Sequence, residues 1–177
     1  PGIPDPLWSR GLGDVYKRQA FDKVDHRLLL QKLSRMGIHG KLLSWITAFL
    51  SNRKQCVLVK GTKSRPILVI SGVPQGTVLG PLLFIVFIND ITEVVKHSHI
   101  KIFADDSKLQ GNIKSLEDKA NLQEDLNAVV KWAKDNNMEL NEKKFELLHH
   151  GYNEPLKEDY TLPSGKTITS SNTTLKT

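Results

Sequence analysis

Apolar residues recur at helical spacing in two segments of the first third of the chain. Leu29, Leu33 and Met36 lie three to four residues apart, and Gly37 follows them as a left-handed C-terminal stop. Residues 42–50 repeat this spacing with leucine, tryptophan, isoleucine and phenylalanine. The two patterns predict two amphipathic helices, and each needs a partner surface for its apolar stripe.

Short β-branched runs predict two hairpins. Residues 55–60 and 66–70 flank a polar turn that contains Gly61, and residues 100–103 and 107–109 flank an acidic turn. In both places strand-forming residues meet across residues that favour a tight reversal of the chain.

Two further helices are expected. Residues 82–91 are apolar nearly all round and follow Gly80-Pro81, so we expect a buried helix with proline at its first position. Ser115 and Asp118 have the spacing of a capping box. The helix that they open carries an apolar stripe and closes at 135–137; the stripe is Leu122, Leu126, Val129 and Ala133.

The two ends of the chain differ in character from its middle. Residues 1–19 are rich in proline and glycine, show no periodicity, and resemble a translated sequencing-adapter scar. Near the other end, residues 145–149 have strand character, and 160–162 and 167–168 flank a Pro-Ser-Gly turn. That turn predicts part of a third hairpin.

Composition fits one folded domain with a weak preference for a polyanionic partner. The 177 residues are 39% hydrophobic and 25% charged, and the formal net charge is +6. The single Cys56 excludes an internal disulfide framework and a cysteine-based zinc cluster, which fits an intracellular location. The longest apolar stretch, 78–88, is too short to span a bilayer, so we expect no membrane partner.

Asp105 and Asp106 are candidate metal ligands. They lie at the tip of the second predicted hairpin, where a turn lets neighbouring carboxylates converge. Such oxygen ligands suit magnesium, which binds a few carboxylates together with substrate phosphates. Taken alone, an Asp-Asp turn is more often a solvated cap.

The loop at 71–76, with the sequence SGVPQG, is a candidate binding loop. Gly72 and Gly76 flank Pro74 and let the backbone approach a ligand closely, and the Gln75 amide can both donate and accept. The alternative is a strand-to-helix connection whose glycines and proline serve only the turn.

Together these two motifs resemble reverse transcriptases of non-LTR retrotransposons, jockey- or LINE-like. The match consists of Phe103-Ala104-Asp105-Asp106 and the run from 71 to 90, in that family's order and spacing. The resemblance implies that loop 71–76 lies against the template strand and the incoming nucleotide. It also implies that Asp105 and Asp106 are catalytic and bind two Mg²⁺ ions in the intact site.

Residues 20–26 (AFDKVDH) resemble the end of the family's first catalytic motif. That motif has an aspartate four residues before the alanine, but Tyr16 stands there, and a phenol with a reference pKa of about 10 is no bridging carboxylate. Phe21 corresponds to the aromatic gate that excludes a ribose 2′-hydroxyl; its alternative is a core phenylalanine. We expect Asp22, Asp25 and His26 to be surface or helix-cap residues.

Residues 141–148 resemble the family's next motif, in which a lysine lies near the nucleotide phosphates. Lys144 is that lysine, and the resemblance implies that it neutralises or protonates the leaving pyrophosphate as a general acid. The alternative is an exposed lysine on a charged turn.

The resulting expectation is an α+β reverse-transcriptase palm, a small antiparallel sheet with helices 119–136 and 82–91 packed on one face and more helix than strand. Residues 1–19 would be a non-family tail, 20–150 a partial palm, and 151–177 the start of a connection toward a thumb.

The implied activity is RNA-directed DNA polymerisation, with an RNA template, a DNA primer and deoxynucleoside triphosphates. An endonuclease domain in the parent polyprotein and a nuclear or cytoplasmic ribonucleoprotein location are implied by the family alone. Because of Tyr16 and the missing fingers and thumb, we expect the chain itself to be inactive. The alternative is a non-catalytic, basic RNA-binding relic.

Overall fold

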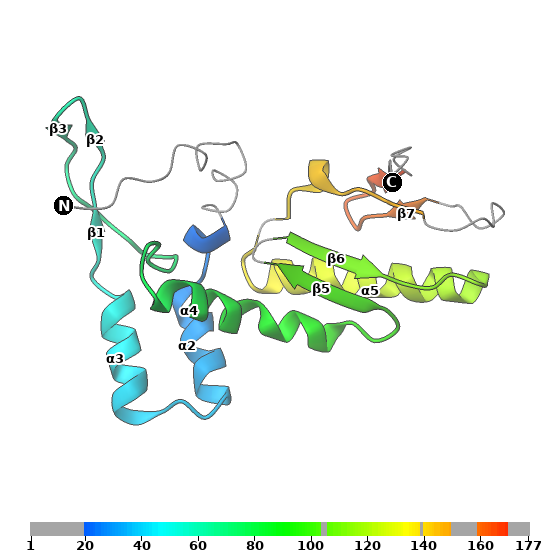
Figure 1. Cartoon of the computed structure of the whole chain (residues 1–177), viewed down its shortest axis with the longest axis horizontal. Helices are drawn as coiled ribbons and strands as arrows, with labels where there is room; N and C mark the ends of the chain where they lie inside the picture. Colours follow the sequence, from blue (N-terminus) through cyan, green and yellow to red (C-terminus); the bar gives the residue numbers. More distant parts are fainter. Residues whose placement is uncertain (1–19, 104–105, 139, 150–158, 170–177) are drawn as a thin grey trace. The chain divides into compact units, whose positions relative to one another are not determined.

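The computed structural model describes residues 20–103, 106–138, 140–149 and 159–169, and the chain divides into two compact units, 1–89 and 90–177. Each unit combines helices with small antiparallel two-stranded sheets, so the described chain is α+β (Figure 1). Helices contain more of the described residues than strands do, as predicted. Within these ranges every helix is too short or too polar to cross a membrane.

Helix α2, His26–Arg35, begins and ends where local signals predict. The Asp25 carboxylate accepts a hydrogen bond from the backbone N–H of Leu28 at 3.0 Å, which confirms Asp25 as a helix cap. Gly37 follows the helix with φ 89°, the left-handed conformation that glycine adopts without a steric cost.

Helix α3, Gly40–Leu50, packs against α2 through a narrow apolar face. Ile46 and Leu50 are buried, whereas Trp45 is more than half exposed and stacks on Phe49 with ring centroids 6.0 Å apart. The predicted helix is confirmed, but this unit covers only part of its apolar surface.

The first predicted hairpin forms, with an earlier reversal than the sequence pattern indicated. Its antiparallel pairs are β1 (Lys54–Gln55) with β4 (Ile67–Leu68) and β2 (Leu58–Val59) with β3 (Thr62–Lys63). Lys60 and Gly61, with φ of 47° and 83°, make the two-residue turn. The tip therefore pairs β2 with β3, and the apolar run at 66–70 pairs only near the base.

Helix α4, Leu79–Ile88, starts before the predicted position, so Pro81 is the third helical residue and not the first. The proline still lies within the first turn, where N–H groups have no partner inside the helix. The expectation of full burial was wrong in part, because Leu82 and Ile85 are each 56% exposed. Within its unit α4 packs on α2, which covers one side. A 3₁₀ helix, η2 (Asn89–Val94), follows.

A buried lysine joins α2 to α4. The Lys32 ammonium donates to the backbone carbonyl of Phe87 at 2.6 Å and lies 4.4 Å from the centroid of the Phe87 ring. That carbonyl belongs to the last turn of α4, where backbone acceptors lack intrahelical donors and a positive charge is favoured.

The second unit contains the hairpin of β5 (His99–Phe103) and β6 (Asp106–Gln110), which confirms the predicted acidic-turn hairpin. Helix α5, Leu116–Asp135, follows it and begins with the predicted capping box of Ser115 and Asp118. Asn136 is the C-cap of α5, and Asn137 takes the left-handed position with φ 57°.

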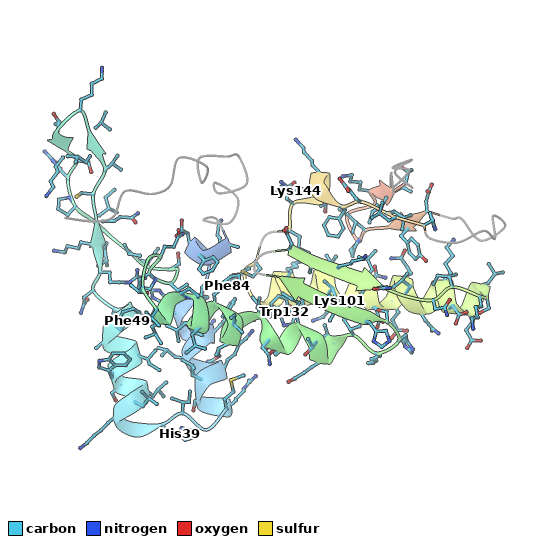
Figure 2. The ribbon with its side chains drawn as sticks, viewed as in Figure 1. His39, Phe49, Phe84, Lys101, Trp132 and Lys144 are labelled. Atoms are coloured by element: carbon cyan, nitrogen blue, oxygen red, sulfur yellow. The ribbon has the colours of Figure 1, made fainter. Side chains whose placement is uncertain are left out.

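The inner face of α5 carries Val129, Trp132 and Ala133, all buried. The indole N–H of Trp132, a residue labelled in Figure 2, donates to the Asp90 carboxylate at 3.0 Å. Asp90 thus has a structural contact within its own unit, since a buried indole N–H needs an acceptor.

The third predicted hairpin also forms, from β7 (Tyr160–Thr161) and β8 (Thr167–Ile168). Tyr160 and Ile168 are buried, and burial raises the pKa of the Tyr160 phenol above its ordinary value. The strand expected at 145–149 is reduced to one isolated bridge residue, Leu147.

A buried carboxylate on α5 organises the loop before β5. The Asp125 side chain is 1% exposed and accepts four hydrogen bonds of 2.7–2.9 Å, from the backbone N–H groups of Lys96, His97 and Ser98 and from the Ser98 hydroxyl. Burial alone would raise the pKa of Asp125, but these donors outweigh it, so the pKa lies below its ordinary value.

We predict that Asp125→Asn destabilises the second unit by about 2–4 kcal/mol at neutral pH, because an amide cannot accept the same set of N–H donors. Urea unfolding and amide exchange at residues 96–98 measure this. The matched control, Glu124→Gln, alters an exposed neighbour and should cost less than about 0.5 kcal/mol.

The same carboxylate sets a pH dependence. Its folded pKa is lowered, so its stabilisation is complete above the unfolded value of roughly 3.9 and is lost as the pH falls through the folded value. Stability of Asp125→Asn should therefore fall less steeply than that of the unmodified chain in acid; equal acid sensitivity would contradict the assignment.

Candidate functional site

Loop 71–76 is held against residues 20–24 by backbone hydrogen bonds. The N–H of Gly72 donates to the carbonyl of Val24 at 2.8 Å, and the N–H of Val73 donates to the carbonyl of Phe21 at 3.0 Å. Val24 and Val73 are buried at this contact. We call these two bonds the loop latch; it joins segments that are far apart in the sequence.

Glycine is required in the latch for a steric reason. Gly72 has φ 83°, and a Cβ atom there would lie 2.7 Å from the Cα of Asp22, closer than atoms can approach. Gly76 also has positive φ, 74°, but a Cβ there would meet no atom within 4 Å. The first glycine thus permits close backbone packing, and the second serves the turn.

The far end of the loop is closed by its own turn. The Thr77 hydroxyl donates to the carbonyl of Pro74 at 2.8 Å and accepts from the N–H of Gly80 at 3.0 Å. A Cβ at Gly80 would lie 2.1 Å from the Pro74 carbonyl oxygen. The loop therefore enters α4 directly, in a conformation that its small residues allow.

Asp22 is bonded to the loop through both its backbone and its side chain. Its carbonyl accepts from the Ser71 hydroxyl at 2.8 Å, and its carboxylate accepts from the Gln75 amide at 3.2 Å. The sequence predicts Asp22 as a surface or helix-cap residue, and it is exposed. Its carboxylate also orients the Gln75 amide, and no sequence pattern indicates this second role.

Phe21 is held by an aromatic stack. Its ring lies nearly parallel to the Phe84 ring of α4, with centroids 4.2 Å apart and planes 14° apart. Phe84, labelled in Figure 2, is buried. Phe21 itself is half-buried. One ring face is thus packed against the core of the unit while the residue remains beside loop 71–76.

Two cationic or ionisable side chains converge on the Gly72 carbonyl. The Arg53 guanidinium donates to it at 2.5 Å, and the His26 imidazole Nε2 lies 2.8 Å from it. Arg53 also donates to the carbonyl of Leu50 at 3.1 Å, at the end of α3. Burial lowers the pKa of Arg53, and the Asp22 carboxylate opposes that effect.

Asp106 is the first residue of β6, opposite Phe103 of β5, and its side chain is exposed. Asp105 and Tyr16 lie outside the described residues. In the described part of the chain no group of three or more His, Cys, Asp and Glu side chains is arranged to hold a metal ion.

Lys144 lies at the end of the 3₁₀ helix η3, Glu142–Lys144, and is exposed (Figure 2). The Asn141 side chain caps this turn by accepting from the N–H of Lys143 at 3.1 Å, and the Lys166 ammonium donates to the carbonyl of Glu142. The turn that presents Lys144 is thus held at its beginning by two side chains.

Within the first unit Phe21 lies beside loop 71–76, which contains Gly72, Pro74, Gln75 and Gly76; the binding role of these residues stays a prediction. Asp106 and Lys144 belong to the second unit. The site residues that sequence reasoning missed are Asp22, His26 and Arg53. Each contacts a residue of the loop that lies 19 to 53 residues away along the chain, a relation that periodicity does not encode.

Comparison with known proteins identifies the family. Residues 15–171 match the family described as "Reverse transcriptase (RNA-dependent DNA polymerase)". The chain belongs to the reverse transcriptase family. This reverse transcriptase chain carries the SGVPQG loop and the FADD sequence within the matched range.

Its relatives are reverse transcriptases of non-LTR retrotransposons. It is 38% identical over 135 residues to the RNA-directed DNA polymerase from mobile element jockey of Drosophila melanogaster, covering 72% of this chain and 15% of that protein. It is 32% identical over 93 residues to the probable RNA-directed DNA polymerase from transposon X-element of the same species, covering 50% and 10%.

A third relative is the Pol polyprotein from the type-1 retrotransposable element R2 of Popillia japonica, 38% identical over 68 residues and covering 38% of this chain and 10% of that protein. The reverse transcriptase chain therefore spans at most 15% of the length of these three relatives.

Reverse transcriptases use Mg²⁺, and the donor chemistry at the β5–β6 hairpin fits that ion. Asp106 is exposed at the beginning of β6, and Asp105 precedes it directly in the sequence, so the sequence supplies two adjacent carboxyl groups. Carboxylate oxygens are ligands that magnesium prefers.

We predict that Gly72→Ala destabilises the first unit by about 3 kcal/mol, because it adds both left-handed strain and a clash with Asp22. Gly76→Ala is the matched control: it adds strain alone and should cost about 1 kcal/mol. Urea unfolding measures both values, and amide exchange at residues 72 and 73 reports the latch. Equal costs for the two variants would show that close packing at Gly72 is not the constraint.

Proposed function

We propose that the chain is part of the palm of an RNA-directed DNA polymerase of a non-LTR retrotransposon, and that loop 71–76 and Phe21 position template and nucleotide. The observation that carries this proposal is the loop latch. It fixes the candidate gate aromatic and the candidate template-side loop in one rigid arrangement within the first unit.

The loop latch suggests how nucleotide and template would be held. Backbone without Cβ atoms at Gly72 and Gly76 allows close approach, and the Gln75 amide is oriented by Asp22. Phe21 cannot swing away from a bound sugar without leaving the Phe84 ring. Its bulk would disfavour a ribose 2′-hydroxyl and select deoxynucleoside triphosphates.

In the second unit, Asp105 and Asp106 would hold magnesium, and Lys144 would act on the leaving pyrophosphate. Bound magnesium supplies positive charge to the phosphate oxygens in phosphoryl transfer. Asp106, exposed at the beginning of its strand, can present its carboxylate to such an ion. The Lys144 ammonium, on a turn capped by Asn141, can donate a proton or neutralise charge.

We further propose that Tyr16 makes the present chain inactive as a polymerase. The residue stands where the family motif places a metal-binding aspartate, and a neutral phenol does not replace a shared carboxylate at neutral pH. Loss of a carboxylate that would hold magnesium would weaken transition-state stabilisation by several kcal/mol, which is orders of magnitude in rate.

We predict that the chain shows no template-dependent primer extension on an RNA template with magnesium. Tyr16→Asp should strengthen magnesium-dependent deoxynucleotide binding by roughly tenfold, because it restores a carboxylate. Tyr16→Phe, the matched control, should leave binding unchanged. Extension by the unmodified chain would contradict the proposed inactivity, and identical binding by both variants would contradict the role given to position 16.

A second candidate function is a non-catalytic RNA-binding relic. The formal net charge of +6 favours it, since lysine and arginine bound to phosphates release condensed counterions. This reading needs neither magnesium nor the two aspartates, and it therefore makes a different prediction for a variant at Asp106.

We predict that Asp106→Asn weakens magnesium-dependent deoxynucleotide binding at least about tenfold, as the loss of a metal ligand should. Asp159→Asn, an exposed aspartate in the same unit, is the control and should have no effect. Titration of a fluorescent deoxynucleotide with and without EDTA measures this. RNA binding that persists while Asp106→Asn changes nothing would favour the relic.

A further inference from the structure

The first hairpin concentrates positive charge without any balancing carboxylate. We call residues 53–70 the hairpin arm. From residue 51 to residue 70 the sequence contains no aspartate or glutamate, although the chain has 19 of them. Over the same stretch it has five cations: Arg53, Lys54, Lys60, Lys63 and Arg65.

The whole length of the hairpin arm beyond its base is accessible. Every residue from 54 to 68 is exposed, and Figure 1 shows the β2–β3 tip projecting away from α2, α3 and α4. Aliphatic side chains share this exposure: Leu58 is 62% exposed and Ile67 is 65% exposed. Neither face of this hairpin is packed within the described part of the first unit, and a two-stranded hairpin with exposed aliphatic side chains is suited to contact with another molecule.

The tip presents a lysine in an unfavourable backbone conformation. Lys60 has φ 47°, in the left-handed region that glycine or asparagine usually occupies in a two-residue hairpin turn. The strain costs about 1 kcal/mol and persists at the point farthest along the hairpin from its anchored base. The tip of the hairpin arm thus carries a cation in a conformation that disfavours a side chain.

The base of the hairpin arm is continuous with loop 71–76. The carbonyl of Arg53 accepts from the N–H of Val69 at 2.8 Å, and the Arg53 guanidinium donates to the Gly72 carbonyl. Ser71, the first residue of the loop, follows residue 70, the last residue of the hairpin arm. The hairpin arm and the loop are thus joined by both the chain and a charged side chain within one unit.

We propose that the hairpin arm binds the phosphate backbone of the RNA strand that loop 71–76 positions. The identity of the strand rests on the proposed function. The contact itself is inferred from the charge and exposure of the hairpin arm. Lys60, Lys63 and Arg65 neutralise phosphates, while the aliphatic side chains lie against sugars and bases.

Strand register argues against a lipid surface as the occupant. Cross-strand partners share one face of a hairpin, so Leu58 lies with Lys63 and Val59 lies with Thr62. Neither face at the tip is wholly apolar, whereas insertion into a bilayer interface requires one apolar face opposite a charged one.

The test compares two triple variants of the chain for binding a fluorescent single-stranded RNA of about 20 nucleotides in EDTA. The first, Lys60→Gln, Lys63→Gln and Arg65→Gln, neutralises the hairpin arm. The matched control, Arg27→Gln, Arg35→Gln and Lys41→Gln, removes the same charge from exposed positions on or beside α2 and α3 of the same unit.

We expect the hairpin triple variant to weaken binding roughly tenfold or more, and to reduce the slope of log K against log salt by up to about 2, or about 0.7 for each lost contact. The control should weaken binding less than about threefold. Equal losses would mean that only net charge matters and would overturn the proposal.

Cys56 provides a second readout that leaves every cation in place. It is the chain's single cysteine and is exposed on the hairpin arm, so a photoactivatable crosslinker can be attached there alone. Irradiation should crosslink it to the RNA. The control moves the cysteine to an exposed α3 position through Cys56→Ser with Ser44→Cys, and should give little crosslink.

Failure of this proposal is distinguishable from failure of the proposed function. Absence of a Cys56 crosslink, with normal nucleotide binding, overturns the hairpin contact alone. A crosslink without any magnesium-dependent nucleotide binding supports the hairpin contact while the polymerase assignment fails. Binding to phosphatidylserine vesicles that depends on the hairpin cations, with unchanged RNA affinity, overturns the proposal in favour of a membrane.

Discussion

The first unit depends on a contact between two stretches of backbone that leaves no room for a side chain. The N–H groups of Gly72 and Val73 donate to carbonyls of residues 24 and 21, before α2, and the backbone of Gly72 therefore packs closely against that of Asp22. Three side chains take their positions around this backbone contact: the Gln75 amide, the stacked Phe21 ring and the Arg53 guanidinium. The backbone is the scaffold, and the side chains are arranged around it.

The second unit obtains its order differently, from buried side-chain acceptors. Asp125 gathers three successive backbone N–H groups and a hydroxyl before β5, and Asp90 accepts from the buried Trp132 indole. Removing a carboxylate from water is costly, but several hydrogen-bond donors to it can offset that cost. The loop leading to β5 is therefore fixed before the hairpin that carries Asp106 begins.

Sequence reasoning succeeded where the deciding signal is local. The Asp25 cap, the stop at Gly37 and the capping box at Ser115 are each set within about four residues, so a pattern can reveal them. It failed where a distant partner decides. The exposed side of α4 depends on which helix covers it, and Asp125 is buried although a helical aspartate is usually solvated.

The candidate site shows the same division. Phe21, Gln75 and the glycines of the loop were predicted through family resemblance; they lie together in the first unit, and their binding role stays a prediction. Asp22, His26 and Arg53 were not predicted as part of it, because their partners lie 53, 46 and 19 residues away along the chain. Such contacts form only when the tertiary fold brings distant segments of the chain together. The metal-binding role of Asp105 and Asp106 stays a prediction.

The stacked pair of Phe21 and Phe84 has an evolutionary consequence. One ring belongs to the segment before α2 and the other to α4, yet their faces touch. A change of size in one ring leaves a void or a clash at the other, so neither position drifts independently. If Phe21 also discriminates between sugars, substrate choice and core packing are inherited together, and a lineage that altered its selectivity would have to remodel α4 with it.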